Sequence, residues 1–238
     1  MKKRIWELDA LRGICILGML VVHILFDLIL FDLWQPGKQI GGIYRFLTQW
    51  GGILFLLLSG ICVTLGSHPI RRGAVVLASG FLCTLVTWGG YRLDMMDKGI
   101  VIYFGVLHCL GICMLLWPLF KKLPLWALAV LAIAMIALGY GIESYRVKGM
   151  WLVWLGLLPQ GFVSGDYFPL LPNLGYFLLG AMGGLTLYRN KTSLLPRISG
   201  QNAVLRFFRA CGRYSLHIYL LHQPVIYGLI YAYAEVFT

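Results

Sequence analysis

Long apolar runs constrain this chain more than any other feature of its sequence. Crossing the ~30 Å hydrocarbon core of a bilayer takes about 20 residues of helix. Seven segments satisfy that need, near residues 10–33, 46–67, 74–92, 99–120, 123–142, 169–188 and 214–236. The sequence therefore predicts an all-α, polytopic transmembrane helix bundle with about seven spans, which forms one integral membrane domain over residues 1–238.

Composition excludes several other classes of protein. Hydrophobic residues make up 60% of the chain and charged residues 12%, against roughly 25% charged in an ordinary soluble domain. A disordered chain, a nucleic-acid-binding module and a typical cytosolic enzyme are all excluded by these figures. A further apolar stretch, Met150–Phe162, is too short to span a bilayer, and we expect it to be an interfacial or re-entrant piece.

The distribution of positive charge predicts the orientation of the spans. If the N-terminus is cytosolic, 13 of the 20 Lys and Arg residues fall in inner loops, as the positive-inside rule requires. The predicted topology is therefore N-in and C-out, which needs an odd number of spans. Six basic residues between positions 189 and 213 exceed what topology needs. They are suited to anionic lipid head groups or to the phosphates of a cytosolic ligand.

Ionisable residues inside predicted spans are costly and are usually functional. The first span carries Asp9, Arg12, His23 and Asp27, and helical geometry places all four on one stripe. A stripe of this kind is expected to face the interior of the bundle. Arg12 can alternatively serve as an interface anchor, and Asp9 as a cap of the first helix.

Two further histidines share the expected depth of His23 near the middle of the bilayer. They are His108 in the fourth span and His222 in the last, whereas His217 is nearer the inner end and His68 lies in an inner loop. Each buried histidine can line a site, or it can simply hydrogen-bond a neighbouring helix. The sequence leaves both readings open.

Four stretches in order resemble one family of membrane proteins. They are Glu7–Gly13 with His23, Gly105–Gly111, Asp166–Gly175 and Gly212–Pro224. This pattern resembles bacterial membrane proteins similar to the catalytic domain of heparan-α-glucosaminide N-acetyltransferase. The resemblance covers nearly the whole chain. It implies an acyl-CoA-dependent membrane acyltransferase that moves an acyl group from cytosolic acetyl-CoA or another acyl-CoA to an acceptor across the membrane. The expected acyl group is acetyl.

A second resemblance concerns the first span alone. The spacing Arg12–x10–His23 is similar to the first-span motif of acyltransferase family 3, in which the matching histidine is the proposed catalytic residue. The animal lysosomal enzyme places its active histidine nearer the outer end of this span. Because this chain has no histidine between His23 and His68, His23 is the nearest candidate.

The resemblance and the residue chemistry together suggest roles for the candidate residues. His23 is expected to act as general base or as an acylated nucleophile, with Asp9 or Asp27 orienting it. Basic residues suited to CoA phosphates are Arg12, Arg206, Arg209 and Arg213. The remaining candidates are His108 and His222 in the same cavity, and Asp166 and Asn173 as acceptor-binding residues at the outer mouth. No metal is expected.

The expected partners are acyl-CoA, an extracytoplasmic glycan with an amino or hydroxyl acceptor group, and membrane lipids. The sequence neither predicts nor excludes a homodimer, and it excludes nucleic acid as a partner. The expected location is the bacterial cytoplasmic membrane. Two other functions use the same residues. A transporter or flippase for a lipid-linked or anionic solute would use the buried charges as a gate, and a bis-histidine haem protein would use His23 with His108 or His222 as axial ligands.

Overall fold

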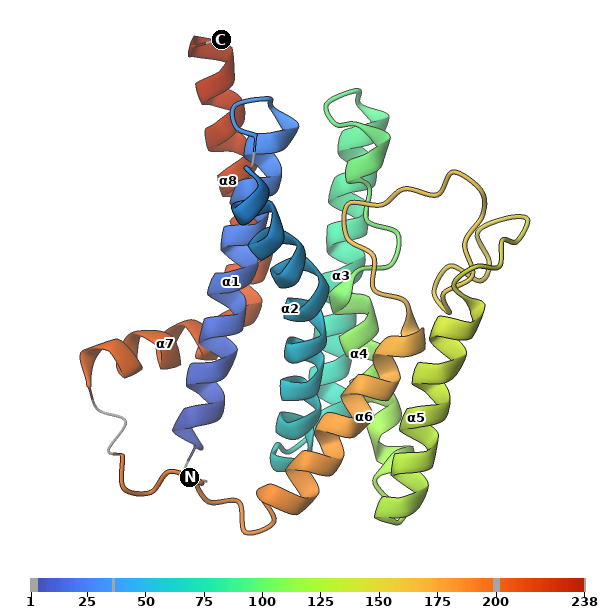
Figure 1. Ribbon diagram of the computed structural model, residues 1–238, viewed down its shortest axis with the longest axis vertical. Helices are drawn as coiled ribbons and strands as arrows, with labels where there is room; N and C mark the ends of the chain where they lie inside the picture. The colour runs from blue at the N-terminus through green and yellow to red at the C-terminus, as the bar shows by residue number, and fades with distance from the viewer. Residues whose placement is uncertain (1–3, 36, 199–201, 238) are drawn as a thin grey trace. The chain divides into compact units, whose positions relative to one another are not determined.

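The computed structural model describes residues 4–35, 37–198 and 202–237 and is built from helices joined by short connections (Figure 1). Apart from two isolated bridges, these parts of the chain contain no β structure. In chain order the helices are α1 (Trp6–Leu30), α2 (Lys38–Leu65), α3 (Pro69–Arg92), the short 3₁₀ helix η1 (Lys98–Ile100), α4 (Val106–Phe120), α5 (Leu125–Ile142), α6 (Leu170–Leu187), α7 (Ala203–Arg213) and α8 (Ser215–Phe237).

Five of these helices are long and apolar enough to cross a membrane, namely α1, α2 from Gly41 onward, α3, α5 and α6. The predicted all-α, polytopic membrane architecture is therefore confirmed. The other two predicted spans correspond to α4 and α8, which are not among the helices long and apolar enough to cross a membrane. Helix α4 has 15 residues, which give about 22 Å of helix, less than the ~30 Å needed. Helix α8 has 23 residues, but His217, His222 and Gln223 lower its mean hydropathy.

The chain divides into two compact units, each described here by itself. The first unit consists of Met1–Phe55 and Asn190–Thr238 and contains α1, the first half of α2, α7 and α8. Within it α7 runs across α1 (Figure 1). A Cβ atom at Gly13 would overlap the carbonyl oxygen of Phe208, and one at Gly212 would overlap that of Asp9. The two glycines therefore let the backbones of α1 and α7 come into contact.

The second unit is the continuous segment Leu56–Arg189, which contains the end of α2 and helices α3 to α6. Glycines again bring helices together: a Cβ atom at Gly60 would overlap the carbonyl oxygen of Phe177, and one at Gly180 would overlap that of Leu57. These positions join α2 to α6. Phe177 is fully buried at the centre of this packing.

The segment before α4 corrects one predicted boundary. A span was expected from residue 99, but the helix begins only at Val106, because η1 and an extended segment come first. In the extended segment Phe104 pairs with Tyr167, and its carbonyl oxygen accepts a hydrogen bond from Phe168 N–H. His108 is therefore the third residue of α4 and not a mid-helix residue.

Residues 143–169 connect α5 to α6 through turns, and Met150–Phe162 contains no helix. This segment was expected to be an interfacial or re-entrant piece, and its turns agree with a non-spanning element. The hydroxyl of Tyr167 donates to the carbonyl oxygen of Val153 at 2.8 Å. Burial raises the pKa of that hydroxyl, so it stays protonated and keeps its donor role.

Candidate functional site

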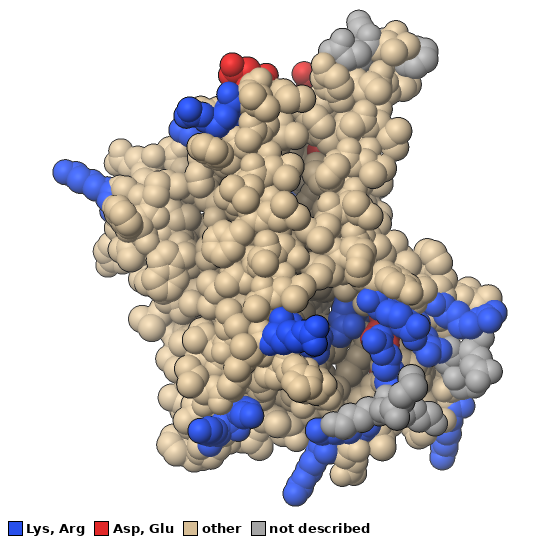
Figure 2. Space-filling model, turned by 180° about the vertical axis from the view of Figure 1, so that it is seen from behind, with Lys and Arg blue, Asp and Glu red and all other residues tan. Residues whose placement is uncertain are grey.

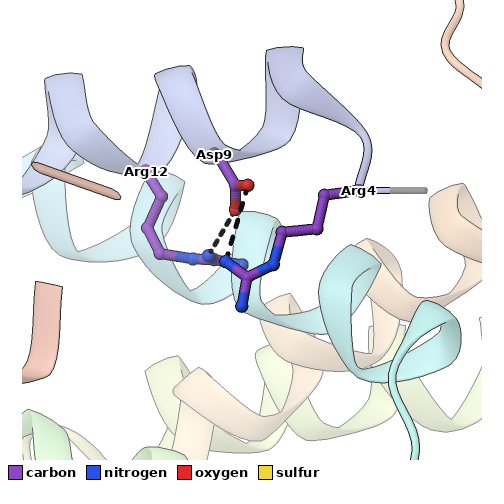
Figure 3. Close-up of polar contacts among 3 residues, drawn as sticks. All are labelled: Arg4, Asp9 and Arg12. Carbon is purple, nitrogen blue, oxygen red and sulfur yellow. Dashed lines mark hydrogen bonds and ion pairs between the residues drawn. The ribbon is translucent and has the colours of Figure 1, made fainter. Parts of the chain in front are cut away.

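The first turns of α1 hold a small charged cluster at the N-terminal end of the first unit. Arg12 donates to Asp9 at 3.2 Å, one helical turn away, and Arg4 lies 3.9 Å from the other oxygen of the same carboxylate (Figure 3). Asp9 is buried, whereas the side chain of Arg4 is 60% exposed. One carboxylate thus faces two guanidinium groups.

A second acidic residue in the same turn, Glu7, makes long-range hydrogen bonds that the sequence did not predict. Glu7 is 6% exposed. Its carboxylate accepts hydrogen bonds from the Ser193 hydroxyl at 2.9 Å and from Leu194 N–H at 2.8 Å. The connection between α6 and α7 is therefore fastened to the start of α1. No local sequence signal predicts this contact, because the partners lie almost 190 positions apart.

Three of the predicted phosphate-binding arginines lie on α7. Arg206, Arg209 and Arg213 are spaced by three and four residues, so they share one face of the helix. Arg206 and Arg213 are exposed and Arg209 is half-buried. The face of the molecule drawn in Figure 2 is mostly uncharged, with Lys and Arg side chains gathered in patches. The α7 arginines offer phosphate-binding groups in water.

The polar residues further along α1 meet a matching set on α8. The rings of His23 and His222 lie edge to face with centroids 4.7 Å apart. The Nε2 amide of Gln223 donates to both carboxylate oxygens of Asp27, at 2.9 and 3.0 Å. His23 and Asp27 are one turn apart on α1, and their partners are adjacent on α8. We call these four residues the α1–α8 polar cluster.

The cluster agrees with one part of the predicted four-residue stripe, namely His23 and Asp27, and adds Gln223. His23 and Asp27 lie on one face of α1, and that face contacts α8. Asp27 is fully buried and His222 is 8% exposed. Gln223 was not predicted from the sequence, because burying a neutral amide in a membrane span costs much less free energy than burying a charged group. Its position beside His222 in a helix that faces His23 was the available signal.

Hydrogen bonds to backbone carbonyls set the tautomer of both histidines in the cluster. Nδ1 of His23 lies 2.9 Å from the carbonyl oxygen of Met19, and Nδ1 of His222 lies 2.6 Å from that of Tyr219. A carbonyl oxygen can only accept, so each Nδ1 carries the hydrogen. In a neutral ring the other nitrogen, Nε2, is then an unprotonated base.

Two buried acceptor atoms in the cluster have no hydrogen-bond partner among the described residues. They are Nε2 of His222 and Oε1 of Gln223, which are neighbours in sequence on α8. Leaving a buried acceptor unsatisfied costs about 1–3 kcal/mol. Such atoms in a polar cluster are positions where a ligand or a water molecule can donate hydrogen bonds.

His108 belongs to the second unit and its ring is used differently. Its Nδ1 accepts a hydrogen bond from Gly105 N–H at 3.2 Å, so in the neutral ring Nε2 carries the hydrogen. Nε2 lies 3.3 Å from the hydroxyl oxygen of Thr84, which itself donates to the carbonyl oxygen of Ile102 at 2.7 Å. Both ring nitrogens are therefore occupied in holding the start of α4.

The two predicted acceptor-binding residues also make contacts within the second unit. Asp166 accepts from Val106 N–H at 2.9 Å, which caps the N-terminus of α4. Asn173 is 7% exposed and donates to the carbonyl oxygen of Pro169 at 2.7 Å. We call His108, Thr84 and Asp166 the α4 cap. His108 and Asp166 accept from the N–H groups of Gly105 and Val106 at the start of the helix, and Thr84 holds the ring of His108.

Possible metal ligands are the His, Cys, Asp and Glu side chains in the part of the chain that the structure describes. Within it no group of three or more His, Cys, Asp or Glu side chains is placed to hold a metal ion. The six cysteines form no disulfide bond. The cluster instead offers two unprotonated imidazole nitrogens, a buried carboxylate and an amide, which are groups suited to proton transfer and hydrogen bonding.

Comparison with known proteins gives one match. The sequence matches the family model described as heparan-alpha-glucosaminide N-acetyltransferase, catalytic, over residues 4–224. No curated protein and no solved structure matched the chain. The matched range begins before the Asp9–Arg12 pair and ends after Gln223, so it includes the whole α1–α8 polar cluster.

Proposed function

Because the chain belongs to the heparan-α-glucosaminide N-acetyltransferase catalytic family, we propose that it transfers acetyl from cytosolic acetyl-CoA to a glycan amino or hydroxyl group across the membrane. The family itself implies transmembrane acetyltransferase activity, and the five apolar helices make the chain an integral membrane protein. The acetyl-CoA donor, the glycan acceptor and a bacterial cytoplasmic membrane are the finer parts of the proposal.

His23 is the proposed general base. Its Nδ1 hydrogen is engaged with the carbonyl oxygen of Met19, which leaves Nε2 free to take a proton from the attacking group. Asp27, one turn further along α1, is the proposed charge partner of the resulting imidazolium. Gln223 holds that carboxylate through both of its oxygens. Proton removal in a site away from bulk water needs such a base close to the reacting atoms.

The donor is proposed to bind at the inner end of α1 through its phosphates. Asp9 offsets only part of the charge of Arg4 and Arg12, and α7 adds Arg206, Arg209 and Arg213 on one face. Guanidinium groups bind phosphates through paired hydrogen bonds. This arrangement supports a CoA-phosphate site in unit one, with the thioester directed toward His23.

We assign the residues of the second unit a supporting role. His108 and Asp166 use their hydrogen-bonding groups on the start of α4, and Asn173 donates to the carbonyl oxygen of Pro169. Groups occupied in this way are less available to a substrate. Of the predicted catalytic set, His23, Asp27 and His222 therefore carry the proposed chemistry, and Asp9 orients Arg12.

The single observation that carries the proposal is the His23–His222 pair with free Nε2 atoms inside the matched family range. The test is acetyl transfer by the full chain in lipid nanodiscs with labelled acetyl-CoA and a mixture of envelope glycans. His23→Ala is expected to lower transfer by ~100-fold to 10,000-fold, the usual contribution of a general base.

The matched control is His217→Ala, which removes an exposed histidine from the same helix as His222. This control is expected to keep wild-type transfer. Both variants are compared by thermal unfolding, so that a loss of fold is not mistaken for a loss of chemistry. Wild-type activity in a folded His23→Ala protein would contradict the proposed base.

A further inference from the structure

Helix α7 carries two kinds of exposed side chain on different sides. Arg206 and Arg213 are exposed and share one face with Arg209. Val204 is 59% exposed and Phe207 is 56% exposed, and their spacing of three residues places both on another face. A helix with basic residues on one side and exposed apolar side chains on the other is typical of an element that lies in a membrane interface.

The packing of α7 on α1 is consistent with such a position. The backbone contact joins Phe208 and Gly212 of α7 to Asp9 and Gly13 of α1. Helical spacing places the arginines on one side of this contact and the two exposed apolar side chains on the other. Because α7 runs across α1 (Figure 1), and α1 is long and apolar enough to cross a membrane, the two sides of α7 face in opposite directions along the span. Arginines on one side and apolar groups on the other fit water on one side and hydrocarbon on the other.

The contact also lies near the end of α1, where an interface is expected. Helix α1 has 25 residues, which give about 38 Å of helix, more than the ~30 Å of hydrocarbon that a span must cross. Asp9 and Gly13 lie about 5 and 10 Å along the helix from its first residue, Trp6. This is the depth at which lipid head groups meet acyl chains.

The charge of the region and its apolar side chains together select the ligand. Positions 189–213 contain six basic residues and no Asp or Glu. Guanidinium groups pair with phosphates, and a polybasic segment at a membrane surface attracts anionic lipids. A soluble phosphate has nothing to cover Val204 and Phe207, whereas a phospholipid supplies a phosphate and acyl chains in one molecule.

We propose that α7 is a binding surface for anionic phospholipids. The lipid phosphate pairs with Arg206 and Arg213, and Val204 and Phe207 lie among the acyl chains. This inference goes beyond the proposed function and concerns the protein without its donor, because the CoA phosphates are proposed to use the same arginines. Its test measures binding and not acetyl transfer. An inactive protein that selects anionic lipid would therefore remove the proposed function and leave this inference in place.

The experiment measures the lipid affinity of the full chain in detergent by native mass spectrometry, without acetyl-CoA. The probes are phosphatidylglycerol, which is anionic, and phosphatidylcholine with the same acyl chains. Each arginine at a charged membrane surface contributes about a fivefold preference. The wild-type protein is therefore expected to prefer phosphatidylglycerol by ~25-fold or more through the two exposed arginines. Replacing both, by Arg206→Gln with Arg213→Gln, should remove most of this preference and leave the affinity for phosphatidylcholine unchanged.

The matched control is Lys121→Gln with Lys122→Gln, which removes two exposed basic residues from the connection between α4 and α5. This connection is predicted to lie on the same side of the membrane as α7, and the control is expected to keep the wild-type preference. An equal loss in the control would show a general attraction to surface charge, and it would overturn α7 as the site.

A third variant tests the apolar side of the helix. Phe207→Ser removes a ring that the proposal places among acyl chains, so it is expected to weaken the binding of both lipids about tenfold. The arginine variant changes one affinity and the phenylalanine variant changes both, a pattern that general damage to the fold would not give. Soluble glycerol phosphate is the remaining probe, and it is expected not to displace bound phosphatidylglycerol. Displacement as efficient as that by free phosphatidylglycerol would overturn the lipid as occupant.

Thermal unfolding of each variant separates lost binding from lost fold. If the double arginine variant fails to fold, Arg206→Gln and Arg213→Gln are tested singly, and each is expected to lose about fivefold of the preference. Equal affinity of the wild-type protein for the two lipids would overturn the inference directly.

Discussion

His222 in the α1–α8 polar cluster and His108 in the α4 cap are both buried, but they use their rings in opposite ways. His222 is 8% exposed and His108 is 2% exposed. In the pair, Nδ1 donates to a carbonyl and Nε2 is a free base. In the cap, Nδ1 accepts from Gly105 N–H and Nε2 faces Thr84. The backbone group beside Nδ1, and not burial, separates a histidine whose Nε2 has no partner from one whose two ring nitrogens are both engaged.

The strongest test of this difference is one substitution made at two places. His23→Gln removes the proposed base and is expected to lower acetyl transfer by ~100-fold or more. His108→Gln is expected to keep transfer near the wild-type rate, because glutamine at the third position of a helix accepts from the N-cap N–H in ordinary capping boxes. Labelled acetyl transfer per folded molecule measures both. Equal losses at the two sites would remove the distinction.

A second change asks how much the cap contributes to stability. His108→Ala leaves Gly105 N–H and the Thr84 hydroxyl oxygen without their ring partner. The expected loss is ~1–3 kcal/mol of unfolding free energy, the cost of unsatisfied buried groups. Reversible unfolding in detergent micelles provides the measurement. The matched control, His108→Gln, is expected to lose less, and a His108→Ala protein as stable as wild type would contradict the assignment.

The smallest expected effect concerns the acidic member of the cap. Asp166→Ala removes the acceptor of Val106 N–H at the start of α4. Loss of such a cap costs ~1 kcal/mol. The change should appear in the unfolding midpoint and not in the KM for the acceptor. A raised acceptor KM with unchanged stability would show instead that Asp166 binds substrate, as the sequence alone suggested.

Much of the fold and part of the site could be predicted from sequence. Apolar length located the helices of all seven predicted spans, and helical periodicity placed His23 and Asp27 on one face. The start of the fourth predicted span was wrong, because the helix was expected to begin at residue 99 and it begins at Val106. The mid-bilayer depth of His108 stays a prediction. Residue counting cannot detect a 3₁₀ turn and an extended segment that apolar residues also fill.

Apart from the shared site of His23 and His222, contacts between distant segments could not be predicted. The Glu7 bonds to Ser193 and Leu194, and the Gln223 bonds to Asp27, depend on which helices meet. The tautomers of the histidines depend in turn on local carbonyl positions. Ordinary polar residues such as Gln223 attract no notice in a sequence, yet they set the hydrogen-bond balance of the cluster.

The division of the chain has a consequence for how the protein is made. The second unit, Leu56–Arg189, is one continuous stretch, so all of it is available once residue 189 has been synthesised. The first unit joins the two ends of the chain. Until α8 has been synthesised, His23 and Asp27 lack their partners His222 and Gln223. Domains fold as units from the N-terminus during synthesis, and here the proposed reaction centre is the last part to be completed. A chain interrupted during translation before α8 therefore lacks the proposed reaction centre.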